Sequence, residues 1–220
     1  MDINKHIEFF NPTLVKNKEI HIIGVGAVGS FIALFLAKLG ISSIHIWDFD
    51  TVEEHNITNQ LYNFKDLNKL KTEALKEHLL NNNPDLLVYC HGKYTNQILR
   101  GIIFSSVDSA ELRYNIASLN QFNTEIKLLI DTRIGLESGQ LYTIDWTNYE
   151  KIENYLKAIN FKDNEVTTPV SACGSTLSVS PSVVITSCYA VAQLINFVNK
   201  QPITPIIVFD AFEFKTRTIK

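Results

Sequence analysis

One segment near the N-terminus does most to limit what this chain can fold into. From Ile20 to Asp50 it reads IHIIGVGAVGSFIALFLAKLGISSIHIWDFD: an apolar run, three glycines in a G-x-G-x-x-G spacing, an apolar stretch of helical length, a second apolar run and two acids. An apolar strand followed by a glycine turn and a helix is the first unit of a nucleotide-binding parallel sheet. The segment therefore predicts an α/β fold with a ligand site at the turn.

The glycines and the first acid predict what kind of ligand this is. Gly24, Gly26 and Gly29 suit a tight turn, a close approach of backbone to phosphate, and close packing of helix on strand. Phosphate oxygens would face the exposed N–H groups at the start of the following helix. Asp48 falls at the tip of the second strand, where a carboxylate can accept both ribose hydroxyls. We expect a nucleotide with a free ribose, although a glycine turn without a ligand has the same pattern.

The rest of the chain alternates between apolar runs and helical segments, which is typical of a parallel sheet wound with helices. The patterns predict strands at 20–23, 44–47, 86–90, 102–107 and 127–130. They predict helices at 30–39, 69–80, 111–119 and 150–159, with Gly40 ending the first. A strand at 140–145, an apolar helix after Pro181 and strands within 206–217 follow.

These elements predict a Rossmann-like, doubly wound, mostly parallel sheet with an antiparallel C-terminal extension. We expect one domain over residues 1–220, because the length suits a single core and no repeat or flexible linker interrupts it. Residues 1–18 would form an N-terminal arm and residues 20–135 the nucleotide-binding core. Residues 136–220 would complete the sheet and lie on the substrate side.

Composition and charge narrow the class of protein. With 45% hydrophobic and 20% charged residues the chain is an ordinary globular protein, and its net charge of -3 gives no strongly basic surface for nucleic acid, although a local basic groove stays open. Residues 177–198 approach the length of a membrane span, but polar residues interrupt them, so we expect a buried helix. The N-terminus has no secretory pattern and the cysteines form no C-x-x-C pair, so we expect a cytoplasmic protein without a structural zinc.

The polar stretch after the second strand does not suit hydride transfer. It reads DFDTVEEHNITNQLYNFKDLNKLKTEAL, and it places Asp50, Asn56, Gln60 and Lys71 where they could reach past the ribose to the phosphates. Lys71 at a helix start is suited to a charge-assisted contact with phosphate oxygens. The alternatives are that Asp50 and Asn56 cap turns, and that Lys71 lies on a solvated helix face, with Lys69 as a rival for its role.

In combination these motifs resemble the ThiF/MoeB/HesA superfamily, to which the adenylation domains of ubiquitin-activating enzymes belong. The resemblance covers residues 15–135 strongly and the rest loosely. It rests on the glycine turn, the D-x-D-x-V run, the N-x-x-x-Q run, the lysine before an A-L pair, and SSVDSAELRYNI, which carries Asp108 and Arg113.

The resemblance implies a reaction and a division of roles. The glycines and Asp48 would hold adenosine; Asn56, Gln60 and Lys71 would hold the phosphates; and Asp108 would hold Mg²⁺. A carboxylate would attack the α-phosphate of ATP and give an acyl adenylate and pyrophosphate. The implied acceptor is the C-terminal carboxylate of a ubiquitin-like or sulfur-carrier protein or peptide. The apolar N-terminal arm and the late apolar helix need covering surfaces, so we expect a homodimer or a heterodimer. A helix N-cap before Ser109 is the alternative for Asp108.

Two departures from the family pattern leave other functions open. Family members usually carry an arginine before the glutamine, and it reaches into the partner's site in homodimers, but here the residue is Asn59. Either Arg133 or Lys65 substitutes for that charge, or the chain is a catalytically weak scaffold subunit of a heterodimer. The paired zinc cysteines of the family are also missing. An NAD-dependent oxidoreductase is a further alternative, and it leaves the polar stretch unexplained.

Two residues in the second half of the chain are candidates for chemistry. Arg133, in DTRIGLESGQLYTID, is expected just after a strand, where it could bind a phosphate or the incoming carboxylate, or form a structural ion pair. Cys173, in the polar run PVSACGST, is the candidate for a thioester, with an inert cysteine as the alternative. Cys90 and Cys188 fall in a predicted strand and a predicted buried helix.

Overall fold

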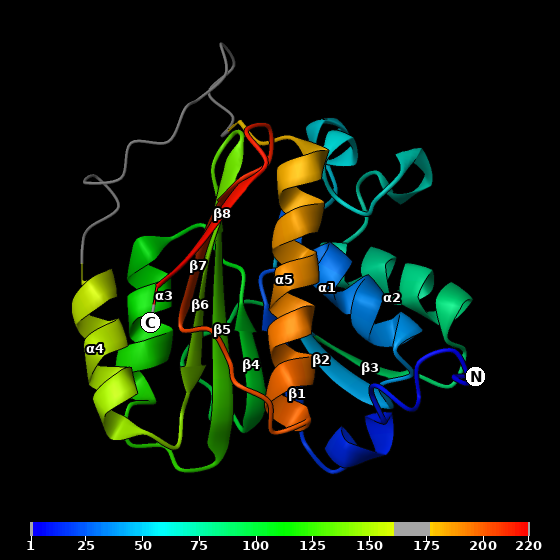
Figure 1. The fold of residues 1–220 in the computed structure, drawn as a ribbon. Coiled ribbons are helices and arrows are strands. Elements are labelled where there is room, and N and C mark those ends of the chain that lie inside the picture. The colour runs from blue at the N-terminus through cyan, green and yellow to red at the C-terminus, as the bar shows by residue number, and fades with distance from the viewer. Residues whose placement is uncertain (1, 161–176, 220) are drawn as a thin grey trace.

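A computed structural model of the chain describes residues 2–160 and 177–219, and within them it contains one eight-stranded sheet (Figure 1). The strand order is β3-β2-β1-β4-β5-β6-β7-β8. The strands are β1 (Ile20–Ile23), β2 (Ser43–Trp47), β3 (Leu87–His91), β4 (Gly101–Ser105), β5 (Ile126–Ile134), β6 (Ser138–Asp145), β7 (Ile206–Asp210) and β8 (Lys215–Ile219). The pairs from β3 to β5 are parallel and those from β5 to β8 are antiparallel. The predicted fold class is confirmed.

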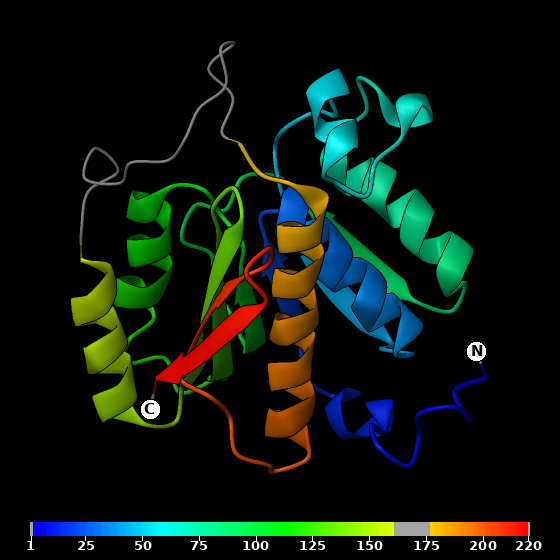
Figure 2. The same ribbon diagram turned by 45° about the horizontal axis from the view of Figure 1, so that its top comes forward.

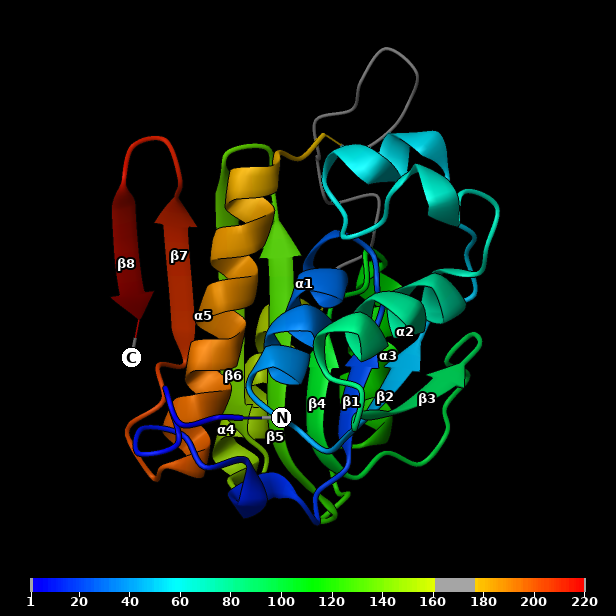
Figure 3. The same cartoon turned by 90° about the vertical axis from the view of Figure 1, so that its right-hand side faces the viewer.

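Helices cover both faces of the sheet. They are α1 (Ala27–Lys38), α2 (Lys71–Asn82), α3 (Ala110–Leu119), α4 (Tyr149–Ile159) and α5 (Ser180–Val198). In Figure 1, α3 and α4 lie on one side of the strands and α1, α2 and α5 on the other, and Figure 3 shows α1, α2 and α5 from the front. Because successive strand residues point to opposite faces, Ile22 and Ile23 belong to the two separate hydrophobic cores.

The strand order reverses between β1 and β4. β1 pairs with β2 on one side and with β4 on the other. The connections from β1 to β3 therefore run towards one edge of the sheet, and those after β4 run towards the other edge. In sheets of this type ligands bind outside the carboxyl ends of the strands at such a switch point. The turn after β1, the loop after β2 and the loop after β4 therefore meet at one edge.

The structure corrects two of the predicted boundaries. α1 begins at Ala27, three residues earlier than expected, so Gly29 lies inside the helix rather than in the turn. β5 continues to Ile134, so Asp131 and Arg133 lie within the strand and not after it. The reason for the second difference is β6, which returns antiparallel and pairs Arg133 with Gln140. Such a long-range pairing leaves no trace in the hydrophobic pattern of β5 itself.

The polar stretch after β2 folds into two short 3₁₀ helices at Glu54–Thr58 and Phe64–Asp66. Each is closed by a capping box, so the polar residues satisfy the backbone of the stretch. Figure 2 shows both turns at the carboxyl edge, close to the first turn of α5. A third 3₁₀ helix, Pro12–Val15, belongs to the N-terminal arm.

α5 is long and apolar enough to cross a membrane by length and composition, with 44% of its apolar window buried inside the protein. It packs on α1, β5 and β6. The expected burial of this helix inside the protein is found in part, since Cys188 on this helix is exposed. Neighbouring atoms partly desolvate the Cys188 thiol and so raise its pKa above the usual value, which disfavours the reactive thiolate.

Candidate active site

The three glycines of the turn meet different surroundings. A Cβ at Gly24, where φ is +84°, would lie 2.7 Å from the carbonyl oxygen of Ser106, and a Cβ at Gly29 would lie 2.0 Å from that of Gly24. Packing alone therefore requires glycine at these two positions. A Cβ at Gly26 would meet no atom within 4 Å. Open space thus lies beside the residue that caps α1, where N–H groups can face an anion.

Asp48 is held by two backbone hydrogen bonds. Its Oδ2 accepts from the N–H of Val25 at 2.9 Å and its Oδ1 from the N–H of Asp50 at 3.0 Å. Burial raises the pKa of Asp48, against the lowering effects of the Asp50 N–H and of the charge of Lys71. The carboxylate ties the glycine turn to the loop after β2, and each oxygen keeps a second lone pair for a further donor.

Lys71 lies at the first position of α2 with its side chain directed back to the loop after β2. Its Nζ is 2.9 Å from Oδ2 of Asp50, and its backbone N–H donates to the carbonyl of Asp50 at 2.9 Å. The alternative of a solvated helix face is wrong, because Lys71 is 7% exposed. Lys69 instead pairs with Glu77 at 2.6 Å on the surface. The structure therefore brings Asp48, Asp50 and Lys71 together at the carboxyl edge.

Asn56 and Gln60 lie in the loop that follows. Asn56 is buried, and its Oδ1 accepts from the N–H of Glu53 at 2.9 Å, so its alternative role as a turn cap is present in the structure. Gln60 has a buried Oε1 that no atom of the described residues hydrogen-bonds. A buried amide oxygen without a partner is costly unless a ligand or water satisfies it.

Tyr62 was not predicted and fixes this loop to the glycine turn. Its hydroxyl donates to the carbonyl of Val25 at 2.7 Å, and the N–H of Leu61 donates to Oγ of Ser30 in α1 at 3.2 Å. Burial raises the pKa of Tyr62 well above its usual value, and the charges of Asp48 and other acids add to this effect. Tyr62 therefore stays a neutral donor. Only its position two residues after the N-x-x-x-Q run could have drawn notice to it.

Asn59, which replaces the usual arginine, is engaged within its own chain. Its Nδ2 donates to Oγ of Ser178 at 2.6 Å, just before α5. Next to it, Oγ of Ser180 donates to the carbonyl of Thr58 at 2.8 Å. No sequence signal pointed to this contact, because the two segments are 119 residues apart.

Asp108 lies in the loop after β4 and is exposed. The alternative that it caps α3 is wrong, because Ser109 is the cap and accepts from the N–H of Leu112 at 3.1 Å. Among the residues that the structure describes, no atom hydrogen-bonds the Asp108 carboxylate, and no cluster of three or more metal-ligand side chains occurs. A single exposed carboxylate fits Mg²⁺, which prefers a few carboxylate and phosphate oxygens and retains waters.

Arg133 forms the structural ion pair that was its alternative role. Its Nε and Nη2 lie 3.2 and 3.1 Å from Oδ2 of Asp131, which is fully buried. Arg113, from α3, approaches Oδ1 of the same carboxylate at 3.2 Å. The guanidinium of Arg133 also lies over the ring of Tyr142, 4.8 Å from its centroid. Two arginines on one carboxylate leave a net positive charge at this end of β5.

Cys173, the candidate for a thioester, falls outside the described residues.

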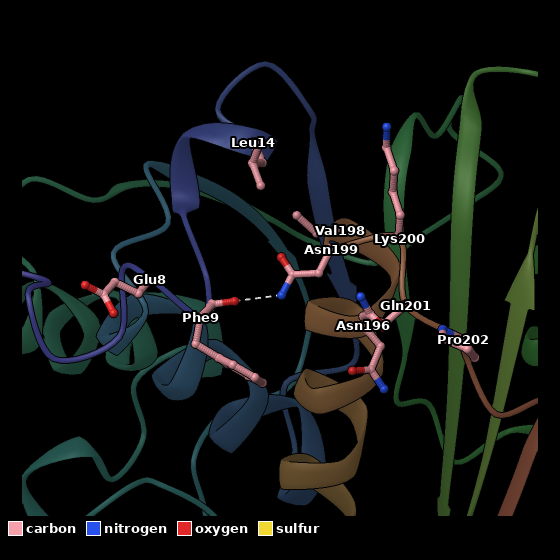
Figure 4. A pocket seen from close by; sticks show the side chains of 9 residues that line it. All are labelled: Glu8, Phe9, Leu14, Asn196, Val198, Asn199, Lys200, Gln201 and Pro202. Atoms are coloured by element: carbon pink, nitrogen blue, oxygen red, sulfur yellow. Dashed lines mark hydrogen bonds between the residues drawn. The ribbon is translucent and has the colours of Figure 1, made fainter.

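The structure has a pocket away from the carboxyl edge of the sheet. A pocket of about 830 Å³ lies between the N-terminal arm and the last turn of α5, where Nδ2 of Asn199 donates to the carbonyl of Phe9 at 2.6 Å (Figure 4). None of the predicted site residues lines this pocket.

Together, the fold, the glycine turn and the acid at the tip of β2 define a nucleotide-binding α/β protein of the Rossmann type. Residues 12–220 match the ThiF family, and the chain belongs to that family.

Similar proteins come from two kinds of comparison. The chain is 28% identical to ubiquitin-like modifier-activating enzyme 5 of Caenorhabditis elegans, over 45% of this chain and 28% of that protein. It is 32% identical to adenylyltransferase and sulfurtransferase MOCS3 of Drosophila willistoni, over 43% of this chain and 21% of that protein. The crystal structure of E. coli MccB with ATP shares the fold with a TM-score of 0.72 and 21% identity, over 95% of this chain and 65% of MccB. The matched region thus spans less than a third of the activating enzyme and of MOCS3.

Proposed function

We propose that the chain binds ATP with Mg²⁺ at the glycine turn and transfers the adenylyl group to a carboxylate. A carboxylate oxygen of the acceptor attacks the α-phosphorus, and the bond from that phosphorus to the oxygen bridging to the β-phosphate breaks. The bonding electron pair leaves with pyrophosphate, and the acceptor becomes an acyl adenylate. Membership of the ThiF family and a fold shared with MccB, which was crystallised with ATP, support the proposal.

The single observation that carries the proposal is the position of Lys71. Its ammonium is almost fully buried, 2.9 Å from the more exposed carboxylate of Asp50, at the edge where the glycine turn lies. A cation held in place beside developing phosphate charge stabilises the transition state without reorganisation. Hydride transfer develops no new charge on the phosphates, so such a cation would have no part in its transition state, which favours ATP over the oxidoreductase alternative.

The other residues have roles that follow from their surroundings. Asp48, with its position set by Val25 and Asp50, would accept the ribose hydroxyls. The open space beside Gly26 would admit the phosphates to the N–H groups of α1. Asp108 would hold the metal, which would neutralise phosphate charge when bound. Arg133, whose direction is set by Asp131, would face the acceptor carboxylate or a phosphate.

We assign the acceptor to the C-terminal carboxylate of a ubiquitin-like or sulfur-carrier protein or peptide. The names of the relatives, an activating enzyme for a ubiquitin-like modifier and an adenylyltransferase and sulfurtransferase, support this class. A flexible tail is the form of carboxylate that can enter a crevice at a sheet edge.

Exchange of labelled pyrophosphate into ATP tests the proposal, with and without candidate carrier proteins. We expect carrier-dependent exchange by the wild type and none by Asp108→Ala. Protection of the chain by NAD rather than ATP would contradict it.

A scaffold subunit without turnover is a second candidate, favoured by one observation. Asn59 stands where the family carries an arginine, and its amide is bonded to Ser178 instead of being directed to a phosphate. Binding of a partner without exchange, for every carrier tested, would support this candidate over the enzyme.

A further inference from the structure

The loop that carries Asn56 and Gln60 is tied to a distant part of the chain by two hydrogen bonds. The amide of Asn59 donates to Oγ of Ser178 at 2.6 Å, and Oγ of Ser180 donates back to the carbonyl of Thr58 at 2.8 Å. The loop therefore supplies the donor of the first bond and the acceptor of the second. Together they clamp the end of the 3₁₀ helix Glu54–Thr58 to the entry of α5.

The entry of α5 is a firm support for this clamp. α5 packs on α1, β5 and β6, and Oγ of its Ser187 donates to the carbonyl of Val28 in α1 at 3.1 Å. α1 begins at the glycine turn, so α5 is fixed relative to the place where the phosphates are expected. The loop is thus held from two sides, by α5 at Asn59 and by the turn at Tyr62.

We infer that Asn59 and Ser178 are a positioning pair that holds the 54–62 loop in place for the phosphates of ATP. This inference rests on the proposed function, because it assigns the phosphates to that loop. The Asn59 amide donates to Ser178, and we assign its effect to its neighbours: to Gln60, whose buried Oε1 is unpartnered among the described residues, and to Asn56. Both members of the pair belong to the same chain, so the loop needs no residue from a partner to keep this position.

The pair contributes to the position of the loop more than to the stability of the fold. Asn59 and Ser178 are both only half-buried, so either group finds water when the other is removed. The full penalty of an unsatisfied buried group therefore does not apply. Loss of the bond frees the loop, and the cost appears when ATP has to order it again.

The test compares Asn59→Ala and Ser178→Ala with Ser178→Thr, which keeps a hydroxyl, and with Asn199→Ala as a matched control. Asn199 also donates its amide at 2.6 Å, but at the opposite end of α5. The measurements are ATP affinity by calorimetry, KM and kcat of pyrophosphate exchange, and thermal unfolding without nucleotide. Hydrogen exchange of the 54–62 amides adds a readout that needs no ligand.

We expect Asn59→Ala and Ser178→Ala each to weaken ATP binding and raise KM for ATP by roughly three- to tenfold, the range of one hydrogen bond, with kcat and the unfolding temperature nearly unchanged. The double variant should be no worse than either single one, since both remove the same bond. Ser178→Thr should restore affinity, and amide exchange in the loop should be faster in both alanine variants. Asn199→Ala should leave ATP affinity as it is.

Unchanged ATP affinity and unchanged loop exchange in the two alanine variants would overturn the inference, as would an equal loss in Asn199→Ala. A wild-type protein that binds ATP but never exchanges pyrophosphate would contradict the proposed reaction alone, because the affinity for ATP still tests the role of Asn59 and Ser178. A wild type that binds no ATP would overturn both.

Discussion

Nζ of Lys71 lies 2.9 Å from Oδ2 of Asp50, and the two residues differ in exposure, with Lys71 side chain 9% and Asp50 side chain 51% exposed. The buried ammonium of Lys71 is thus held in place by the Asp50 carboxylate, which solvent can reach. A negative ligand entering at this edge can share the ammonium with Asp50 at small cost, since only the more exposed partner is displaced.

Replacement of Lys71 by methionine should reduce pyrophosphate exchange by roughly 10²-fold, the usual effect of removing one preorganised group that faces developing charge. The fold should survive, because the exposed Asp50 remains solvated. Lys69→Met is the matched control: it removes a lysine two residues away that pairs with Glu77 on the surface. Equal losses in the two variants would count against the role of Lys71.

Replacement of Asp108 by asparagine should raise the Mg²⁺ concentration needed for half-maximal exchange and leave the unfolding temperature unchanged, because the carboxylate is exposed. Glu111→Gln, in the first turn of α3, removes a nearby negative charge and serves as the control. A Mg²⁺ titration that is the same for Asp108→Asn and wild type would remove Asp108 from the metal site.

Two glycine substitutions should separate binding from folding. Gly26→Ala adds a Cβ that meets nothing in the protein, so the free energy of unfolding should change by less than about 1 kcal/mol. ATP affinity should fall by roughly tenfold or more, equivalent to about 1.4 kcal/mol. Gly29→Ala should instead destabilise the fold by about 1–3 kcal/mol, because its Cβ would collide with the carbonyl of Gly24. Chemical denaturation and calorimetry measure the two effects, and a stable Gly29→Ala would contradict the packing.

Replacement of Asp131 by asparagine should destabilise the protein by about 3–5 kcal/mol, because it leaves Arg113 and Arg133 without their buried counter-charge. Glu153→Gln removes one partner of the exposed pair with Lys157 and should cost less than about 1 kcal/mol. The check is the midpoint of urea unfolding, and similar midpoints for the two variants would refute the importance of the buried pair.

The stability of the fold should decrease as the pH falls from about 6.5 to 4, through His21. Nδ1 of His21 accepts from Nε1 of Trp47 at 3.1 Å, and burial lowers the pKa of His21 to about 4. The folded state therefore binds fewer protons than the unfolded state in this window. This contribution of His21 to the free energy of unfolding is complete above the pKa that His21 has in the unfolded chain. Up to about 3 kcal/mol of it is lost as the pH falls to the pKa that His21 has in the folded protein.

Replacement of His21 by glutamine should flatten this pH dependence in part. Burial also lowers the pKa values of His45 and His91, so a shallower slope remains. The free energy of unfolding, measured by denaturant at a series of pH values, gives both slopes. An unchanged slope in the variant would show that His21 does not titrate with unfolding.

Local patterns sufficed for most of the architecture and for the position of Asp48 at the tip of β2. The apolar period, the glycine spacing and the acid at the end of β2 are encoded within about thirty residues, and hydrophobic period and turn chemistry act over that range. The strand–turn–helix unit, the parallel sheet and Asp48 at the strand tip all followed from them. The resemblance to the ThiF family also rested on motifs in the first half of the chain, and the family match covers residues 12–220.

Contacts between distant segments decided the rest. The burial of Lys71, the extension of β5 through Asp131 and Arg133, and the bond from Asn59 to Ser178 all depend on segments brought together by folding. The local sequence around Lys71 does not show whether its ammonium will be solvated, and that around Asn59 does not point to the serine 119 residues away that accepts its hydrogen bond. Hydrophobic periodicity specifies which face of an element is buried, but only the packed chain determines which polar groups meet at its edge.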